Sequence, residues 1–182
     1  MNRLAGKVAL VTGAGRGIGA AIARAFVAEG ASVVLAELDG DAARASARDI
    51  GAAYGPNAPV LARETDVTRP DSLRAAVADG ERAFGPIDVL VNNAGINVFC
   101  DPLTMTDDDW RRCFAVDLDG VWNGCRAVLP GMVERGAGAI VNIASTHAFQ
   151  IIPAASRTRS RSTACSASRA RSASNTRRAR SA

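Results

Sequence analysis

The sequence predicts an α/β fold in which an open, doubly wound parallel sheet forms a single domain. Short apolar runs alternate with longer amphipathic stretches along most of the 182 residues, which is the pattern of strand, crossover helix and parallel strand. The runs are nearly unbroken in Val, Ile and Leu, as expected of strands covered on both faces. A cluster of glycines directly after the first run indicates a tight strand-to-helix turn.

The first part of the chain contains two strand and helix pairs. Residues 7–12 (KVALVT) form a continuous β-rich run, followed by glycines and by an Ala-rich helical stretch at 20–29 that Gly30 closes. Residues 32–37 (SVVLAE) are the second predicted strand, and residues 41–50 the second helix.

The middle of the chain continues the alternation. Residues 60–64 form a weaker third strand. The next helix, at 70–84, begins with Pro70 and ends before Gly85-Pro86, as a terminated helix should. Residues 87–91 (IDVLV) are the fourth predicted strand.

The last regular elements are a long helix and a fifth strand. Residues 106–134 have helical character, and a run of three acids from Asp107 favours the helix N-terminus through the helix dipole. Pro130 is expected to kink this helix. Residues 139–144 (AIVNIA) form the fifth strand, which ends at Ser145.

The net charge of +4 is the sum of two segments of opposite charge. Residues 153–182 hold 8 Arg, 8 Ser and 8 Ala among 30 positions, with no acid and no large apolar side chain. Residues 1–152 keep the other 14 basic and all 18 acidic side chains, so this body carries −4 and the tail +8. We therefore expect a folded domain over 1–152 and a disordered tail over 153–182.

Several classes of protein are disfavoured by composition. The four cysteines (Cys100, Cys113, Cys125, Cys165) have no CxxC spacing, so neither a disulfide scaffold nor a metal site is predicted, and a reduced cytoplasmic location fits best. The N-terminal residues lack a signal-peptide pattern. No apolar run approaches the roughly 18 to 20 residues that span a bilayer, so we expect no membrane partner.

The glycine cluster predicts a dinucleotide site. Thr12-Gly13-Ala14-Gly15-Arg16-Gly17-Ile18-Gly19 lies between the first strand and the first helix. Glycines allow a sharp turn and a close approach to a pyrophosphate, while the helix N-terminus supplies amide donors and positive dipole. The alternative is a turn that serves helix and strand packing without a ligand.

Four motifs in order resemble the short-chain dehydrogenase/reductase superfamily: TGxxxGIG at 12–19, Asp66-Val67 after the third strand, NNAG at 92–95 and a Ser after the fifth strand. The resemblance implies a Rossmann-type fold that is incomplete at its C-terminal side, and an oxidoreductase that moves hydride between NAD(P) and an alcohol or ketone. By this resemblance the pyrophosphate lies on Gly13, Arg16, Gly17, Ile18 and Gly19. The adenine contacts Asp66 and Val67, and the nicotinamide side is supported by Asn93, Ala94 and Gly95.

Glu37 predicts the choice of cofactor. An acidic side chain at the end of the second strand accepts hydrogen bonds from a ribose 2′-OH and repels a 2′-phosphate, so NAD is favoured over NADP. Arg16 argues weakly in the other direction, because it could bind that phosphate. The alternative interpretation of Glu37 is a solvated strand end.

Two further residues take catalytic roles from the resemblance. Ser145 stands at the position of the family's catalytic serine, whose hydroxyl hydrogen-bonds the reacting oxygen. The family usually has an Asn in the long helix to anchor a relay water, but this chain has Asp117, whose charge would alter such a relay. The lone His147 is interpreted as structural.

The family's general acid/base Tyr, and the Lys four residues after it that lowers the Tyr pKa, are absent. The chain has one Tyr, Tyr54, and one Lys, Lys7, so no YxxxK exists. The abrupt change of composition suggests a frame change near codon 153. A codon choice compatible with 153–176, read from the last base of codon 153, gives GCFPYPVAKHGLLGLTRALGIEY, with Tyr and Lys four codons apart.

These observations leave three functional hypotheses open. The first is an oxidoreductase by descent with a small alcohol or ketone substrate, inactive here because Tyr and Lys are missing, marginally stable and prone to aggregation. The second is a catalytically dead dinucleotide-binding module. The third, nucleic-acid binding through the basic tail, is disfavoured because the tail has no aromatic residues for base stacking, so no specific nucleic acid is expected. The family commonly forms homo-oligomers through the long helix and the missing Tyr/Lys helix, which puts assembly in question.

Overall fold

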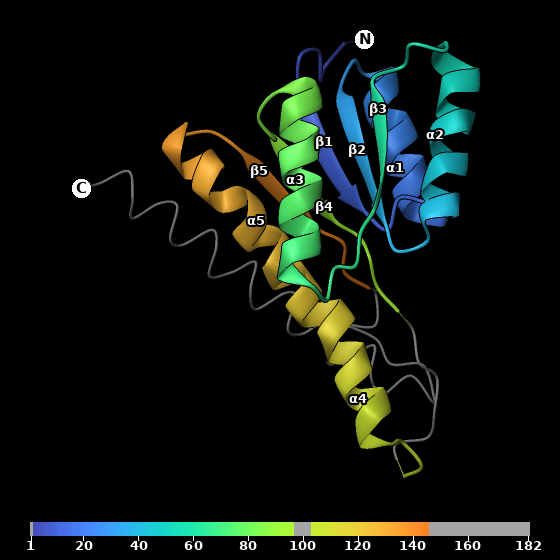
Figure 1. Ribbon diagram of the computed structural model, residues 1–182, viewed down its shortest axis with the longest axis vertical. Coiled ribbons are helices and arrows are strands. Elements are labelled where there is room, and N and C mark those ends of the chain that lie inside the picture. Colours follow the sequence, from blue (N-terminus) through green and yellow to red (C-terminus); the bar gives the residue numbers. More distant parts are fainter. Residues whose placement is uncertain (1, 97–102, 146–182) are drawn as a thin grey trace. The chain divides into compact units, whose positions relative to one another are not determined.

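The computed structural model describes residues 2–96 and 103–145, and it confirms the predicted α/β fold class (Figure 1). These residues belong to two compact units. The first comprises the chain up to Ala94 together with Asp119–Val141, and the second the described parts of Gly95–Leu118 with residues 142–145. The predicted tail at 153–182 and the residues His147, Cys100 and Cys165 lie outside the described residues.

The sheet has five strands in the order β3-β2-β1-β4-β5. Their bounds are β1 Val8–Thr12, β2 Ser32–Glu37, β3 Val60–Glu64, β4 Val89–Asn92 and β5 Ala139–Asn142. Strand β1 pairs in parallel with both β2 and β4, and Leu10 lies opposite Val34 on one side and Leu90 on the other. The strand order therefore reverses between β1 and β4, which creates the switch point of a doubly wound sheet.

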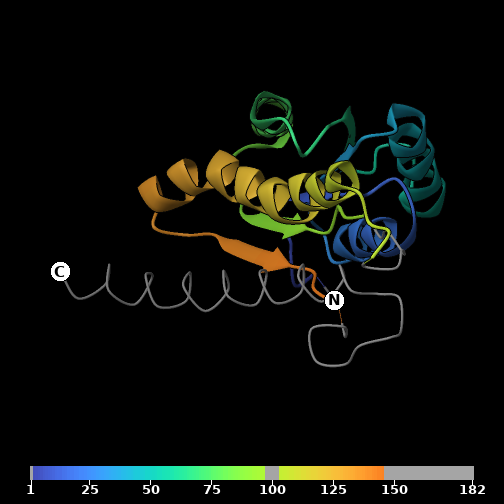
Figure 2. The same cartoon turned by 90° about the horizontal axis from the view of Figure 1, so that it is seen from below.

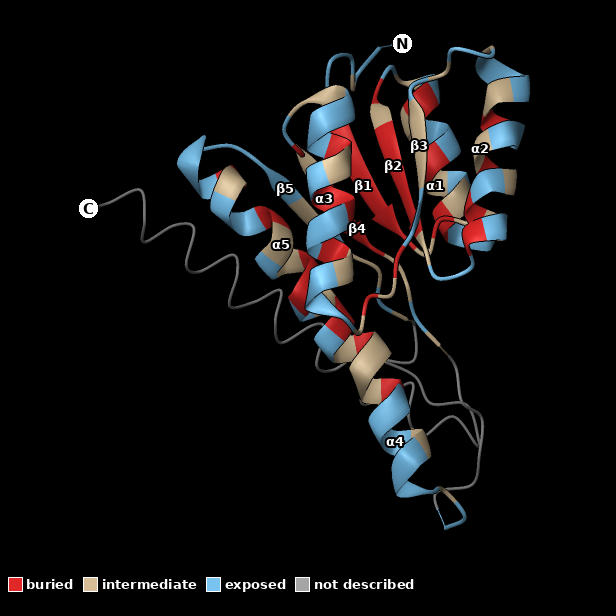
Figure 3. Cartoon of the chain, viewed as in Figure 1, coloured by how far each residue is buried: buried red, intermediate tan, exposed pale blue. Residues whose placement is uncertain are grey.

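Helices cover both faces of the sheet (Figures 1 and 2). Helices α1 (Gly17–Ala28) and α2 (Gly40–Tyr54) lie on one face, and α3 (Pro70–Phe84) and α5 (Gly120–Glu134) on the other. All five residues of β1 are buried, as are the four central residues of β2, and Figure 3 shows this buried centre. A core joins these strands to α3 and α5 through Val8, Leu10, Val34, Ala36, Ala76, Val77, Ile87, Leu90, Val128 and Met132.

Three predicted elements, at 32–37, 60–64 and 70–84, have the bounds that the sequence indicated. Helix α1 begins at Gly17, three residues before the expected start, because its first turn is part of the glycine turn. Because Gly has a low helix propensity, the sequence did not indicate that the helix begins there. Helix α2 continues past Ile50 to Tyr54. Strands β1, β4 and β5 differ from their expected bounds by at most two residues at either end.

The long predicted helix is interrupted. It consists of α4 (Asp107–Phe114), a π-helical turn (Ala115–Asp119) and α5, with Pro130 inside α5. The acids at its start do mark a helix N-terminus, and the Thr106 hydroxyl accepts a hydrogen bond from the Asp109 amide at 3.1 Å. Single π turns of this kind within α-helices are frequently found at functional sites.

Candidate nucleotide site at the switch point

The glycine turn joins β1 to α1 at the carboxyl end of the sheet. Gly13 has φ +65°, and a Cβ there would lie 2.9 Å from the Ala94 Cα atom, so only glycine permits this close approach of two backbones. Gly17 has φ +57°, and a Cβ there would meet nothing within 4 Å. Arg16, Gly17 and Ile18 are exposed, so the first turn of α1 is open to a ligand.

Thr12 and Asn93 join the two strand ends at the switch point. The buried Thr12 hydroxyl accepts hydrogen bonds from the amides of Asn93 and Ala94, each at 3.0 Å. The Asn93 side-chain amide donates back to the carbonyls of Thr12 at 3.0 Å and Gly13 at 3.2 Å. These four bonds fix the glycine turn against the NNAG segment. The sequence indicated both motifs but not the bonds between them.

Glu37, at the end of β2, folds against the glycine turn. Its Oε2 atom accepts a hydrogen bond from the Gly15 amide at 3.0 Å, and its Oε1 atom accepts one from the Asp39 amide at 3.2 Å. A Cβ at Gly15 would lie 2.7 Å from the Glu37 Cγ atom, so glycine is what lets this carboxylate approach. Arg16 reaches the same place, where its Nη2 atom lies 3.1 Å from Asp39 Oδ2.

Asp66 and Val67 follow β3 in a tight turn. Asp66 Oδ1 accepts hydrogen bonds from the Thr68 amide at 2.9 Å and the Thr68 hydroxyl at 2.7 Å, and the Asp66 amide donates to the Ser72 hydroxyl at 3.0 Å. The buried Asn123 of α5 donates to the Val67 carbonyl at 3.0 Å. Sequence reasoning missed Asn123, because an Asn within an apolar helix gives no motif.

The described geometry thus connects Gly13, Gly19, Asn93 and Ala94 at the switch point, and separately connects Glu37 with Gly15. Gly95, Asp117 and Ser145 belong to the second unit. Gly95 is exposed, and Ser145 is half-buried three residues beyond β5.

Asp117 is buried in the π turn. Its Oδ1 atom accepts a hydrogen bond from the Ile96 amide at 2.9 Å, and its Oδ2 atom accepts one from the Cys113 thiol at 3.3 Å. The carboxylate therefore holds the segment after NNAG and takes a thiol hydrogen bond within its own helix. No motif in the sequence indicated that Cys113 would contact Asp117.

A charge pair stabilises the start of α2 next to Glu37. The Arg44 guanidinium hydrogen-bonds Asp41 at 2.7 Å and holds the pKa of that carboxyl below its ordinary value. The Asp39 side chain accepts hydrogen bonds from the amides of Asp41 and Ala42, each at 3.1 Å, and so forms the N-cap of the helix.

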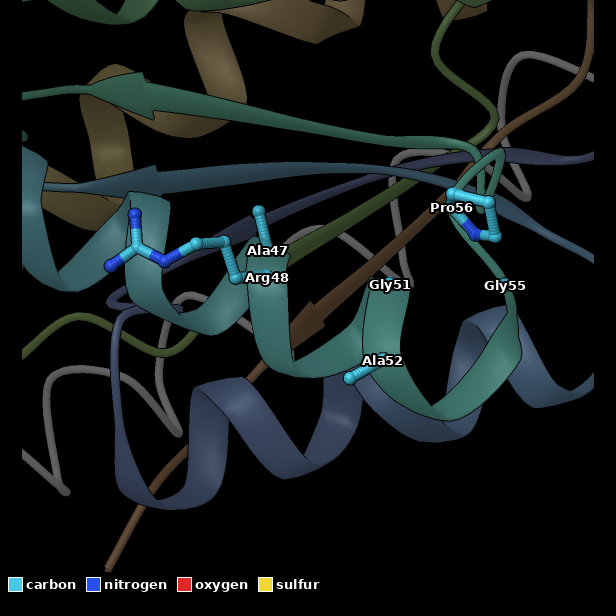
Figure 4. Close-up of a pocket in the computed structure, with 6 residues that line it drawn as sticks. All are labelled: Ala47, Arg48, Gly51, Ala52, Gly55 and Pro56. Carbon is cyan, nitrogen blue, oxygen red and sulfur yellow. The ribbon is translucent and has the colours of Figure 1, made fainter.

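A hollow lies beside the second half of α2, and none of the predicted site residues lines it (Figure 4). It is lined by Ala47, Arg48, Gly51, Ala52, Gly55 and Pro56. Of these six residues, only Arg48 is charged. Over residues 2–96 and 103–145 there is no group of three or more His, Cys, Asp or Glu side chains that could hold a metal, and no helix long and apolar enough to cross a membrane.

A glycine turn at the switch point of a doubly wound parallel sheet defines the Rossmann type of fold, in which this turn is the usual place of a dinucleotide. A family model described as short chain dehydrogenase matches residues 7–157. The chain therefore belongs to the short-chain dehydrogenase family, whose members bind NAD(P).

Individual relatives support this membership. The chain is 45% identical over 143 residues to a galactitol 2-dehydrogenase (L-tagatose-forming) of Cereibacter sphaeroides, covering 79% of this chain and 54% of that protein. It is 41% identical over 143 residues to a D-threitol dehydrogenase of Mycolicibacterium smegmatis, with the same two coverages. The chain thus spans about half the length of the curated relatives it matches.

Solved structures give the same family. A metagenomic short-chain oxidoreductase in complex with NADP superimposes with a TM-score of 0.87 and 36% identity, covering 96% of this chain and 78% of that one. A short-chain type dehydrogenase/reductase from Mycobacterium marinum superimposes with a TM-score of 0.83 and 32% identity, covering 88% and 63%.

Proposed function

We propose that this chain is an NAD-binding member of an alcohol dehydrogenase lineage. The observation that carries the proposal is the glycine turn, held against Asn93 on one side and facing Glu37 on the other. In this proposal the pyrophosphate lies on Gly13, Arg16, Gly17, Ile18 and Gly19, and the adenine lies beside Asp66 and Val67. The residues Asn93, Ala94 and Gly95 support the nicotinamide side.

The residues present are compatible with such a cofactor. The space above Gly17 is open, and the exposed start of α1 offers amide donors and positive dipole to a pyrophosphate. Glu37 is held by two backbone amides at the position where a ribose 2′-OH would donate to it. These features favour NAD over NADP, although the superimposed metagenomic oxidoreductase is a complex with NADP.

For the substrate we propose a small alcohol or the corresponding ketone, since the relatives named for galactitol and D-threitol act on such compounds. When bound, the nicotinamide supplies the hydride chemistry. The role assigned to this chain is to orient the substrate through the Ser145 hydroxyl, which would hydrogen-bond the reacting oxygen. Asp117 holds the Ile96 amide and stands where the family has its relay Asn.

We further propose that the 182-residue chain has little or no turnover, because it contains no Tyr and Lys in YxxxK spacing. The single Tyr and the single Lys are poor substitutes. Tyr54 is the last residue of α2, and Lys7 precedes β1 at the end of the strand opposite the glycine turn, paired with Asp88 at 3.5 Å. Neither can take a proton at the switch point.

In this proposal a frame change near codon 153 accounts for the absence, as the abrupt change of composition at that point suggests. Sequencing the coding DNA tests it directly. A restored frame that encodes YPVAK supports the idea, whereas a DNA sequence that gives no such string in any frame refutes it.

The functional test compares this chain with the product of the frame-restored gene. Both are incubated with NAD and small polyols while NADH formation is followed, and binding of NAD is measured separately. We expect both proteins to bind NAD and only the restored one to reduce it. Robust turnover by the 182-residue chain would contradict the role given to the missing Tyr and Lys. Turnover by neither protein would favour a dead dinucleotide-binding module.

A further inference from the structure

We propose that Asp39 is a specificity-determining residue of the nucleotide site: it binds the Arg16 guanidinium and so keeps Arg16 from holding a ribose 2′-phosphate. This inference rests on the proposed NAD site, and it assigns a role to a residue that belongs to none of the family motifs. Its basis is the set of contacts that joins Arg16, Glu37 and Asp39 at the end of β2.

Asp39 is fixed in place by its own backbone and by one of its carboxylate oxygens. Its amide donates to Glu37 Oε1 at 3.2 Å, which ties it to the end of the strand. Its Oδ1 atom accepts hydrogen bonds from the amides of Asp41 and Ala42, each at 3.1 Å, which ties it to the start of α2. The direction of the second oxygen is thereby set.

That second oxygen, Oδ2, lies 3.1 Å from Arg16 Nη2. Arg16 is the residue before α1 and the only cation within the glycine turn at 12–19. Its side chain is 75% exposed, so packing does not determine where the guanidinium lies. The carboxylate of Asp39 is therefore the group that holds it at the end of β2.

The charges at this position explain the consequence for selectivity. Glu37 and Asp39 contribute two negative charges and Arg16 one positive charge, which leaves the group at −1. A 2′-phosphate brings close to two more negative charges and is repelled, whereas a 2′-OH can donate to Glu37. Guanidinium groups bind phosphates through paired hydrogen bonds, so an Arg16 released from Asp39 would offset Glu37 and accept the phosphate.

The Asp39→Asn variant separates charge from structure, because the Asn oxygen can still cap α2. Binding of NAD and of NADP to the full chain is measured by titration calorimetry for wild type, Asp39→Asn, Arg16→Leu and the double variant. Circular dichroism spectra and melts of all four proteins establish that the substitutions leave the overall fold and its stability in place.

We expect Asp39→Asn to tighten NADP binding about two- to five-fold, the range of an exposed ion pair, and to change NAD binding less than about two-fold. In the Arg16→Leu background the same substitution should raise NADP affinity by a clearly smaller factor, because only the loss of one negative charge then acts on the phosphate. An equal gain with and without Arg16 would overturn the proposal, because it would reflect net charge alone. Unchanged NADP affinity in Asp39→Asn alongside normal NAD binding would also overturn it. Absence of NAD binding by the wild type would instead refute the proposed function, and this inference with it.

Discussion

Replacing Thr12 by Val tests the connection between the glycine turn and the NNAG segment. Val preserves the shape of the buried Thr side chain and removes the hydroxyl, which accepts hydrogen bonds from the amides of Asn93 and Ala94 at 3.0 Å and donates one to the Val91 carbonyl at 3.4 Å. An unsatisfied buried amide costs about 1–3 kcal/mol. Both amides are half-buried and can reach some water, so we expect Thr12→Val to lower the free energy of unfolding by about 2–4 kcal/mol in total.

The assay is urea unfolding followed by circular dichroism, with Thr12→Ser as the matched control. Ser keeps the hydroxyl and loses one methyl group, for which we expect about 1 kcal/mol. NAD binding should weaken in Thr12→Val more than in Thr12→Ser, because the displaced segment belongs to the proposed nucleotide site. A Thr12→Val protein within about 0.5 kcal/mol of wild type, or a Ser variant as unstable as the Val variant, would show that the Thr12 hydroxyl does not hold the two segments together.

Further predictions concern the neighbouring contacts. Gly19→Ala should destabilise the fold by about 1–3 kcal/mol, because its Cβ would overlap the Gly13 carbonyl oxygen. Gly51→Ala, in open space within α2, should stabilise it by up to about 1 kcal/mol in the same urea assay. Asn123→Leu removes the bond to the loop after β3 and should cost about 1–2 kcal/mol, with weaker binding of ADP-ribose measured by calorimetry. Asp117→Asn keeps an acceptor for the Ile96 amide, so its melting temperature should exceed that of Asp117→Leu; equal melting temperatures would contradict that role.

Much of the fold could be predicted because its local signals are strong. Helix α3 has Pro70 in its first turn and ends at Phe84, directly before Gly85, whose φ of +96° excludes most other residues. Pro70 and Gly85 marked its bounds in the sequence. The apolar runs predicted the positions of the strands, because parallel strands covered on both faces need continuous apolar side chains.

The π turn could not be predicted in this way. Residues 106–134 have helical character on both sides of the turn, and nothing in the sequence marks an extra residue in the helix. The structure supplies a reason, since the buried Asp117 is bonded to Ile96, which is distant in sequence, and to Cys113. A contact of this kind depends on tertiary placement and leaves no local signal.

The candidate site likewise has a part that the sequence predicts and a part that depends on tertiary contacts. The glycine turn is contiguous, so its chemistry was evident from residues 12–19. The bonds between Thr12 and Asn93 depend on the pairing of β1 with β4, in which Val11 lies opposite Val91. Asp39 was missed although an Asp before a helical stretch is a common N-cap, because its second oxygen acts on Arg16, 23 residues away in the sequence.

A calorimetric titration of the purified 182-residue chain with NAD tests the proposed nucleotide site most directly. We expect saturable binding to one site per chain, with NADP binding more weakly under the same conditions. Absence of saturable binding by a chain whose circular dichroism spectrum shows the folded α/β structure would contradict the assignment of the glycine turn as a dinucleotide site.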